Sequence, residues 1–180
     1  KLMDKTYCIF RDSVTQAGYV KTGWVEMLRQ YLEEKYPDNF VSVFNLGING
    51  ETTDNVLTRF DNECLVRRPT DIIFAVGIND TKDYDAKQFK DNIEKLISLG
   101  NKFTKDITFV GLVLGDWQGE EPFKIERTTE YNEIITTFAL ENNCKFIPLQ
   151  NKLTPEDFMD GLHPNDQGHE KMFEVIKNYF

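Results

Sequence analysis

The stretch Tyr7-Cys8-Ile9-Phe10-Arg11-Asp12-Ser13 joins a short apolar run to three polar residues near the start of the chain. The four apolar residues follow one another without alternation, which is typical of a strand that is buried on both faces. Strands of this kind belong to parallel sheets that helices cover on each side. The stretch therefore predicts the first strand of a parallel α/β sheet, with Ser13 just beyond its carboxyl end.

Strands and helices are predicted to alternate along the rest of the chain. The apolar runs predict strands at Tyr7–Phe10, Phe40–Phe44, Ile72–Val76, Ile107–Leu114 and Phe146–Leu149. Apolar residues at helical spacing predict helices around Trp24–Leu32, Val56–Cys64, Phe89–Ile97, Tyr131–Phe138 and Met172–Tyr179. Pro37 would end the first helix, and Thr52 or Thr53 could cap the second. Five such alternations predict a flavodoxin-like three-layer α/β/α sandwich with a five-stranded parallel sheet.

Length and composition indicate one domain that spans residues 1–180. A chain of 180 residues is long enough to bury a substantial core, and no internal repeat, low-complexity segment or linker divides it. The net charge of −9 disfavours nucleic acid and anionic membranes as partners. No apolar run approaches the roughly 20 residues that are needed to cross a bilayer. The expected partner is a small molecule, and the oligomeric state is left open.

The cysteines and the first residues bear on the expected location of the protein. Cys8, Cys64 and Cys144 are an odd number without CxxC spacing, and they lie in or beside apolar segments. Buried, reduced thiols are therefore expected. The residues Lys1–Lys5 lack the apolar stretch of a signal peptide. These features favour the cytoplasm, while a leader removed before Lys1 is left open.

The loops after the predicted strands carry the residues from which a site could be built. Ligands bind beyond the carboxyl ends of the strands in open parallel sheets. This edge would receive Arg11–Ser13, Asn45–Thr52, Gly77–Asp80 and Asp160–Pro164. Together these segments supply a hydroxyl group, flexible backbone, an amide, and a carboxylate three residues before an imidazole. Acyl transfer needs such a set, because a serine requires a base that a carboxylate orients and the oxyanion requires donors.

Elimination selects one serine and one histidine from this small inventory. The chain has three serines and two histidines. Ser42 lies inside a predicted strand and Ser98 inside a predicted helix, away from the ligand edge. His169 falls in the first turn of the last predicted helix, where a structural or surface role is expected. Ser13 and His163 therefore form the predicted nucleophile and base.

Each feature taken alone has a plainer interpretation. A single serine after a strand is usually a helix cap, and Asn79-Asp80 alone indicates a turn. The Asp-x-x-His-Pro segment alone could be a loop whose aspartate caps a turn. Gly47 and Gly50 lack the spacing of a dinucleotide or phosphate-binding loop. The joint placement of all four segments on one edge favours the catalytic interpretation.

The four segments resemble the sequence blocks of the SGNH hydrolases, also called GDSL-type esterases and lipases. The matching residues are Ser13 as nucleophile, Gly50 and Asn79 as oxyanion-hole donors, and His163 as base with Asp160 as its partner. The resemblance implies a flavodoxin-like serine esterase that acts through an acyl-enzyme, without metal or cofactor. Members of the family act on small aryl and alkyl esters, thioesters, lysophospholipids or acetylated sugars. The small domain favours short acyl chains, and a carbohydrate O-deacetylase is an alternative.

Arg11 is the departure from the family pattern, which has glycine two residues before the nucleophile. Glycine at such a turn usually means positive φ or a close backbone approach. A side chain forced into left-handed geometry costs roughly 1–2 kcal/mol. Three hypotheses follow: the turn tolerates arginine, the chain is a weakened or ligand-binding homologue, or the guanidinium selects an anionic substrate. By position alone, the predicted pocket walls are Val14, Trp117 and Leu162.

Overall fold

The computed structural model describes residues 3–13 and 20–180. In this part of the chain, five strands form one parallel sheet in the order β2-β1-β3-β4-β5. The strands are β1 (Lys5–Arg11), β2 (Val41–Asn45), β3 (Asp71–Ala75), β4 (Ile107–Val110) and β5 (Lys145–Ile147). This is the strand order of a flavodoxin-like fold, so the predicted α/β architecture is confirmed.

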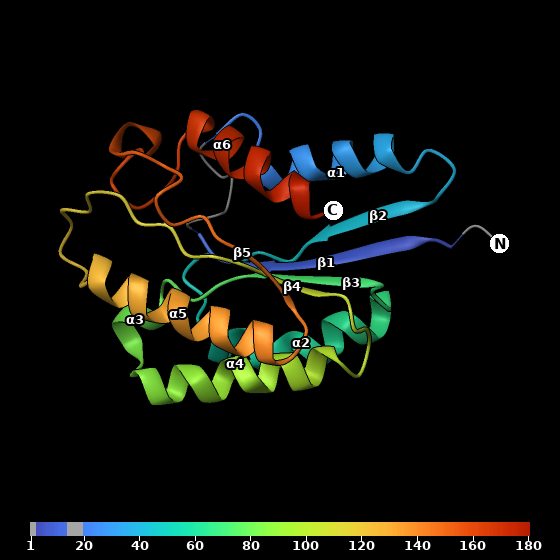
Figure 1. The fold of residues 1–180 in the computed structure, drawn as a ribbon, viewed down its shortest axis with the longest axis horizontal. Coiled ribbons are helices and arrows are strands. Elements are labelled where there is room, and N and C mark those ends of the chain that lie inside the picture. The colour runs from blue at the N-terminus through green and yellow to red at the C-terminus, as the bar shows by residue number, and fades with distance from the viewer. Residues whose placement is uncertain (1–2, 14–19) are drawn as a thin grey trace.

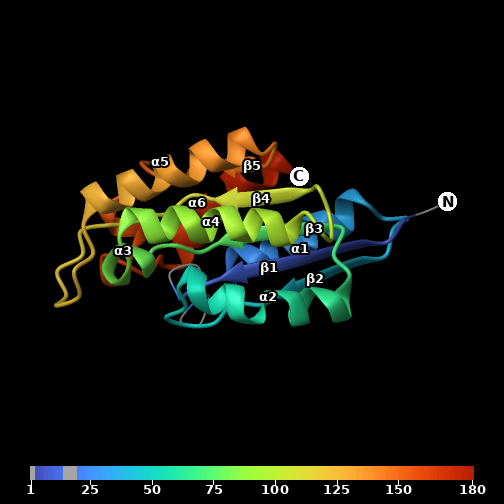
Figure 2. The ribbon, with the colours of Figure 1, turned by 90° about the horizontal axis from the view of Figure 1, so that it is seen from below.

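The helices form two layers, one on each face of the sheet (Figure 1). One layer consists of α1 (Trp24–Lys35) and α6 (Asp166–Ile176), which pack against each other. The other consists of α2 (Thr53–Arg67), α4 (Ala86–Gly100) and α5 (Ile125–Glu141), which lie side by side in Figure 2. The described residues also contain three short helical segments: α3 (Asp80–Asp83), η1 (Pro155–Asp157) and η2 (Lys177–Tyr179). Among the described residues, no helix has the length and apolar character to cross a membrane.

Aromatic side chains bind the central strands to the layer that contains α2. Phe10, Phe74 and Phe109 stand at matching positions of β1, β3 and β4. Their ring centroids are 5.7 Å and 5.1 Å apart along this row. The ring centroid of Phe60, in α2, lies 5.1 Å from that of Phe10, so the helix layer closes the cluster. Stacked and tilted ring pairs of this kind stabilise a core beyond the burial of their area.

The fourth strand is shorter than the sequence predicts, because a side chain takes the place of the hydrogen bonds from a neighbouring strand. β4 ends at Val110, whereas the apolar run continues to Leu114. The side-chain amide of Asn132 accepts from the Leu112 N–H (2.7 Å) and donates to the Leu112 carbonyl (3.1 Å). A buried asparagine thus satisfies both backbone groups that a neighbouring strand would otherwise bind.

Other local predictions can be compared directly with the structure. Thr52 is the N-cap of α2 and forms a capping box with Asn55, which decides between Thr52 and Thr53. The first helix ends at Lys35, before Pro37. The three cysteines are free and buried, as predicted. The short helix α3 was not predicted, because its sequence Asp80-Thr81-Lys82-Asp83 has no apolar periodicity.

Candidate active site

The order of the strands brings the predicted site segments to one edge of the sheet. β1 lies between β2 and β3, so the turn that carries Ser13 lies between the loops that follow those two strands. Ser13 is half-buried, two residues beyond the end of β1. Within the described residues, the structure places no hydrogen bond between the Ser13 hydroxyl and His163. Contacts of this kind often tighten only when substrate is bound.

Asp160 and His163 form a hydrogen-bonded pair in one short loop. His163 Nδ1 lies 2.6 Å from Asp160 Oδ2. The other carboxylate oxygen accepts the N–H groups of Leu162 (2.9 Å) and His163 (2.7 Å). Burial opposes ionisation of Asp160, but these donors outweigh it and hold the pKa of its carboxyl group below the ordinary value. An ionised Asp160 that accepts Nδ1–H leaves His163 Nε2 available for proton transfer.

Gly161 gives this loop its shape, and its role was not recognised in the sequence. Its φ of +82° is in the region that favours glycine. A β carbon at Gly161 would stand 2.7 Å from backbone atoms of Asp116 and Trp117. The Gly161 carbonyl also accepts the Gly115 N–H at 2.9 Å. The loop of Asp160 and His163 is therefore pressed directly against the segment that follows β4.

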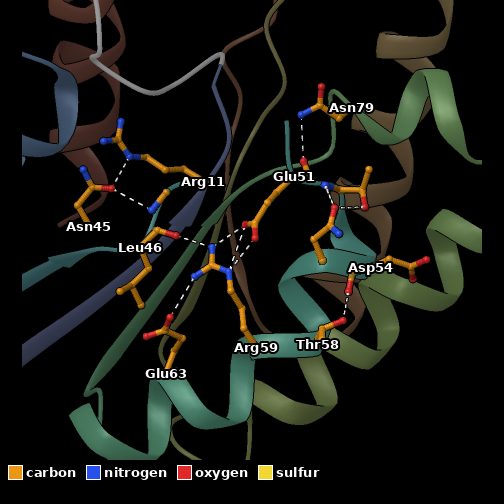
Figure 3. A network of polar contacts seen from close by, with 12 residues as sticks. Arg11, Asn45, Leu46, Glu51, Asp54, Thr58, Arg59, Glu63 and Asn79 are labelled. Atoms are coloured by element: carbon orange, nitrogen blue, oxygen red, sulfur yellow. Dashed lines mark hydrogen bonds and ion pairs between the residues drawn. The ribbon is translucent and has the colours of Figure 1, made fainter. Parts of the chain in front are cut away.

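The two predicted oxyanion donors lie on adjoining loops that one hydrogen bond connects. Asn79 is buried, and its Nδ2 donates to the backbone carbonyl of Glu51 at 3.0 Å (Figure 3). An amide nitrogen has two hydrogens, so the second is available to a ligand. Gly50, the neighbour of Glu51, has a φ of +75°, and in the described part of the chain no atom lies within 4 Å of its β position. Its glycine requirement is therefore conformational rather than steric.

Asp80 is a buried carboxyl group beside Asn79 that sequence reasoning missed as part of this site. It accepts hydrogen bonds from the backbone N–H (3.1 Å) and the hydroxyl of Thr53, the first residue of α2. Burial raises the pKa of Asp80 to about 7, although the Thr53 donors act in the opposite direction. Asn92 in turn donates to the Thr53 hydroxyl at 2.9 Å. The start of α2 is thereby tied to the loop of Asn79.

Arg11 has extended backbone, which is consistent with the hypothesis that the turn tolerates arginine. It is the last residue of β1 and pairs with Ala75. In the described chain, the positive φ angles outside glycine belong to Arg68, Asn143 and Asn151. Arg11 as a whole is 4% exposed, and its Nε donates to Asn45 Oδ1 at 2.6 Å. The energetic penalty of left-handed geometry therefore does not apply to Arg11.

The second histidine is held in the core. His169 is buried in α6, and its Nδ1 accepts the backbone N–H of Trp24 at 3.2 Å. Burial, together with the nearby charge of Arg11, lowers the pKa of His169 to about 4. A neutral histidine that binds the start of α1 has a structural role, and a surface position is excluded.

The predicted pocket walls have different environments. Val14 lies outside the described residues. Leu162 is buried beside the Asp160–His163 pair. Trp117 is half-buried, its Nε1 donates to the Glu121 carbonyl at 2.8 Å, and its ring packs onto Gly119 of the same loop. Contact of these residues with substrate stays a prediction. Among the described residues, no group of three His, Cys, Asp or Glu side chains is arranged to hold a metal ion.

Comparisons with known proteins find similarity to ester hydrolases and to solved structures of the same fold. The model of the GDSL-like lipase/acylhydrolase family matches residues 12–171. The chain is 25% identical over 170 residues to an acetylxylan esterase of Geobacillus stearothermophilus, covering 84% of this chain and 78% of that protein. It is 24% identical over 176 residues to an arylesterase of Vibrio mimicus, covering 93% and 84% of the two chains. A crystal structure of a putative GDSL-like lipase from Parabacteroides merdae superposes with a TM-score of 0.84 at 19% identity, covering 97% of this chain and 94% of that one.

Proposed function

Because the chain belongs to the GDSL-like lipase/acylhydrolase family and is thus a carboxylic ester hydrolase, we propose that Ser13 is its nucleophile. The observation that carries the proposal is the hydrogen bond between Asp160 and His163 at the edge of the sheet where β1 ends, two residues before Ser13. This bond orients an imidazole as a base, and Ser13 is the serine that follows a strand at that edge.

The proposed mechanism assigns one role to each group. His163 Nε2 takes the proton of the Ser13 hydroxyl, and Oγ attacks the ester carbonyl. The N–H groups of Ser13 and Gly50 and the side-chain amide of Asn79 bind the oxyanion, where one donor is worth ~3 kcal/mol. The imidazolium then gives its proton to the departing alcohol. Water, activated by His163 in the same way, releases the acid and restores Ser13.

The solved structures of the Geobacillus stearothermophilus acetylxylan esterase support these assignments. They include three described as catalytic mutants, in which a serine, an aspartate or a histidine is replaced by alanine. The aspartate precedes the histidine by three positions there, as Asp160 precedes His163 here. The same kinds of residue at the same spacing favour a Ser–His–Asp mechanism for this chain.

The substrate is proposed to be a small ester with a short acyl chain. The similarity to an acetylxylan esterase makes an O-acetylated carbohydrate the second candidate, and the similarity to an arylesterase favours aryl esters. Rates on acetylated xylo-oligosaccharides, phenyl acetate and p-nitrophenyl esters of increasing acyl length would decide between them. A preference of tenfold or more for the sugar ester would identify a carbohydrate O-deacetylase.

Replacement of the nucleophile tests the mechanism. Ser13→Ala should lower kcat on p-nitrophenyl acetate by roughly a thousandfold or more, because it removes the attacking oxygen. Ser98→Ala is the matched control, since Ser98 is an exposed serine of α4. Undiminished activity of the Ser13 variant would exclude the assignment, whereas loss of activity in both variants would point to a general effect on folding.

A further inference from the structure

Arg59 of α2 ties together the two ends of the loop that carries Gly50. Its Nη2 donates to the backbone carbonyl of Leu46 (2.5 Å) at the start of the loop. The same nitrogen donates to Glu51 Oε2 (2.6 Å), and Nε donates to Glu51 Oε1 (2.9 Å). Figure 3 shows the guanidinium of Arg59 between these two residues. One side chain therefore spans the turn from Leu46 to Glu51.

The contact between Arg59 and Glu51 is mostly shielded from water. The side chain of Arg59 is 17% exposed and that of Glu51 is 10% exposed. The guanidinium carbon of Arg59 also lies 5.3 Å from the ring centroid of Phe10, in the strand that leads to Ser13. A two-point guanidinium–carboxylate contact fixes orientation as well as distance. Screening by solvent is weak at such a site, so the pair holds a defined geometry.

The backbone at Gly50 is held through its neighbour Glu51. Among the described residues, no atom lies within 4 Å of the position that a β carbon at Gly50 would take. Glu51, the next residue, is held twice: Arg59 binds its carboxylate, and Asn79 donates to its carbonyl. The Gly50 peptide and the Asn79 amide are thus connected through Glu51, which Arg59 anchors.

We propose that Arg59 is a positioning residue for the oxyanion hole, acting through Glu51 and Leu46. The proposal rests on the proposed function, in which the Gly50 N–H and the Asn79 amide bind the oxyanion. Loss of the two-point contact would let the Gly50 donor move relative to Asn79. Such a change weakens binding of the transition state more than binding of the substrate, because the oxyanion forms only during reaction.

Arg67 offers a matched control on the same helix. Both arginines contact Glu63, Arg59 at 3.5 Å and Arg67 at 2.5 Å. Both also lie over a phenylalanine ring, since the guanidinium carbon of Arg67 is 5.0 Å from the ring centroid of Phe44. The contacts of Arg67 are made two turns further along α2, beyond the reach of the Gly50 loop. The two residues therefore share a charge, a helix and a partner, and differ in their contact with the loop.

The test compares Arg59→Lys with Arg67→Lys. A lysine keeps the charge, but one ammonium cannot reproduce the fork that binds Leu46 and both oxygens of Glu51. We expect kcat/KM on p-nitrophenyl acetate to fall roughly 10- to 100-fold in Arg59→Lys and to stay within about twofold in Arg67→Lys. Glu51→Gln, which keeps the shape of the side chain, should show a loss of the same kind. The kcat/KM of the double variant Arg59→Lys/Glu51→Gln should be no lower than that of the less active single variant, because both substitutions break the same contact.

A pair of inhibitors separates positioning from a general structural role. Trifluoroacetophenone forms a tetrahedral adduct whose oxygen would occupy the oxyanion hole, whereas acetophenone binds without forming it. Arg59→Lys should weaken the binding of trifluoroacetophenone by about the same factor as it lowers kcat/KM, and it should leave the binding of acetophenone unchanged. Equal weakening of both ketones, or equal losses in Arg59→Lys and Arg67→Lys, would overturn the proposal.

The outcome is distinguishable from a failure of the proposed mechanism. If Ser13→Ala abolishes activity and Arg59→Lys retains it fully, the nucleophile stands and the role of Arg59 is refuted. If Ser13→Ala remains active, the oxyanion hole itself is misassigned, whatever Arg59→Lys does. Thermal unfolding of each variant shows whether Arg59→Lys remains folded. Should it not fold, the same ketone comparison on Glu51→Gln decides.

Discussion

The side chain of Arg11 lies across Gly47, and the two residues fit only as a pair. A β carbon at Gly47 would stand 2.5 Å from Cγ and 2.8 Å from Nε of Arg11. Asn45 joins them, since its Oδ1 accepts from Arg11 Nε (2.6 Å) and from the Gly47 N–H (3.1 Å). The arginine at the end of β1 is thus accommodated by a glycine in the loop after β2, without distortion of its own backbone.

This packing predicts coupling between the two positions. Gly47→Ala should destabilise the parent chain by about 1–3 kcal/mol, because the methyl group collides with a buried side chain. The same substitution should be nearly neutral in an Arg11→Gly background, where the space is free. Urea unfolding of the two single variants and the double variant measures the coupling free energy. If the free-energy changes of the two single substitutions simply added, the methyl group at position 47 would not collide with Arg11.

Replacement of Arg11 tests whether the arginine impairs catalysis. Its backbone is already extended, so Arg11→Gly should leave kcat/KM on neutral p-nitrophenyl acetate within roughly threefold of the parent. The variant should lose stability, because a buried guanidinium and its hydrogen bond to Asn45 are removed. A large gain in rate on the neutral ester would instead mean that arginine perturbs the site. A loss confined to anionic esters would mean that its charge selects the substrate.

Gly161 and Gly50 have similar backbone geometry but differ in the space available to a β carbon. Both have positive φ, +82° and +75°, so alanine is strained at either position by about 1–2 kcal/mol. Of these two glycines, and with the residues that the structure describes, Gly161 is the one at which the added carbon would also meet backbone, 2.7 Å away. Gly161→Ala should therefore lower the free energy of unfolding by about 2 kcal/mol more than Gly50→Ala does. Chemical denaturation measures the difference. Equal losses of the free energy of unfolding would show that the loop of Asp160 shifts at little cost to accommodate the methyl group.

Asp80 should contribute a dependence of stability on pH. Its folded pKa of about 7 is above the value near 3.9 expected in the unfolded chain, so the folded state binds the proton more tightly. The stabilisation is complete below about pH 4 and is lost as pH rises through 7. Asp80→Asn keeps an acceptor for the Thr53 N–H but cannot ionise. The parent should lose stability relative to this variant between pH 4 and 8 in urea unfolding; parallel pH profiles would contradict the assignment.

The sequence predicts those parts of the fold that depend on local pattern. Apolar runs such as Tyr7–Phe10 lie at the centre of buried strands because burial on both faces excludes polar residues. The Asp160–His163 pair is predictable for a similar reason, since its spacing of three residues fits one loop. The end of β4 is not predictable from its own residues. It depends on Asn132, which reaches Leu112 from a helix 20 positions away.

The residues that support the candidate site escape prediction because their partners are distant in the chain. Arg59 looks like any charged residue on an exposed helix face until the loop from Leu46 to Glu51 is folded beneath it. Asp80 and Thr53 are 27 positions apart, and neither belongs to a pattern that would pair them. The family pattern, which has glycine at the position of Arg11, does not show how an arginine is accommodated there. The strand continues through Arg11, and the space it needs is provided by Gly47.

The central position of β1 has a consequence for the order in which activity is gained and lost. Thr6 and Thr70, which bond where β1 and β3 begin, are separated by 64 positions, whereas His163 and Asp160 are separated by three. Strand pairing between residues that are far apart in the chain is slow, because the entropy of closing a long loop is lost before the stabilising contacts form. His163 and Asp160 can therefore meet early, but Ser13, Gly50 and Asn79 meet only once β1 has paired with β2 and β3. On refolding, we expect hydrolytic activity to return after the helical circular dichroism signal, so that turnover reports the finished sheet.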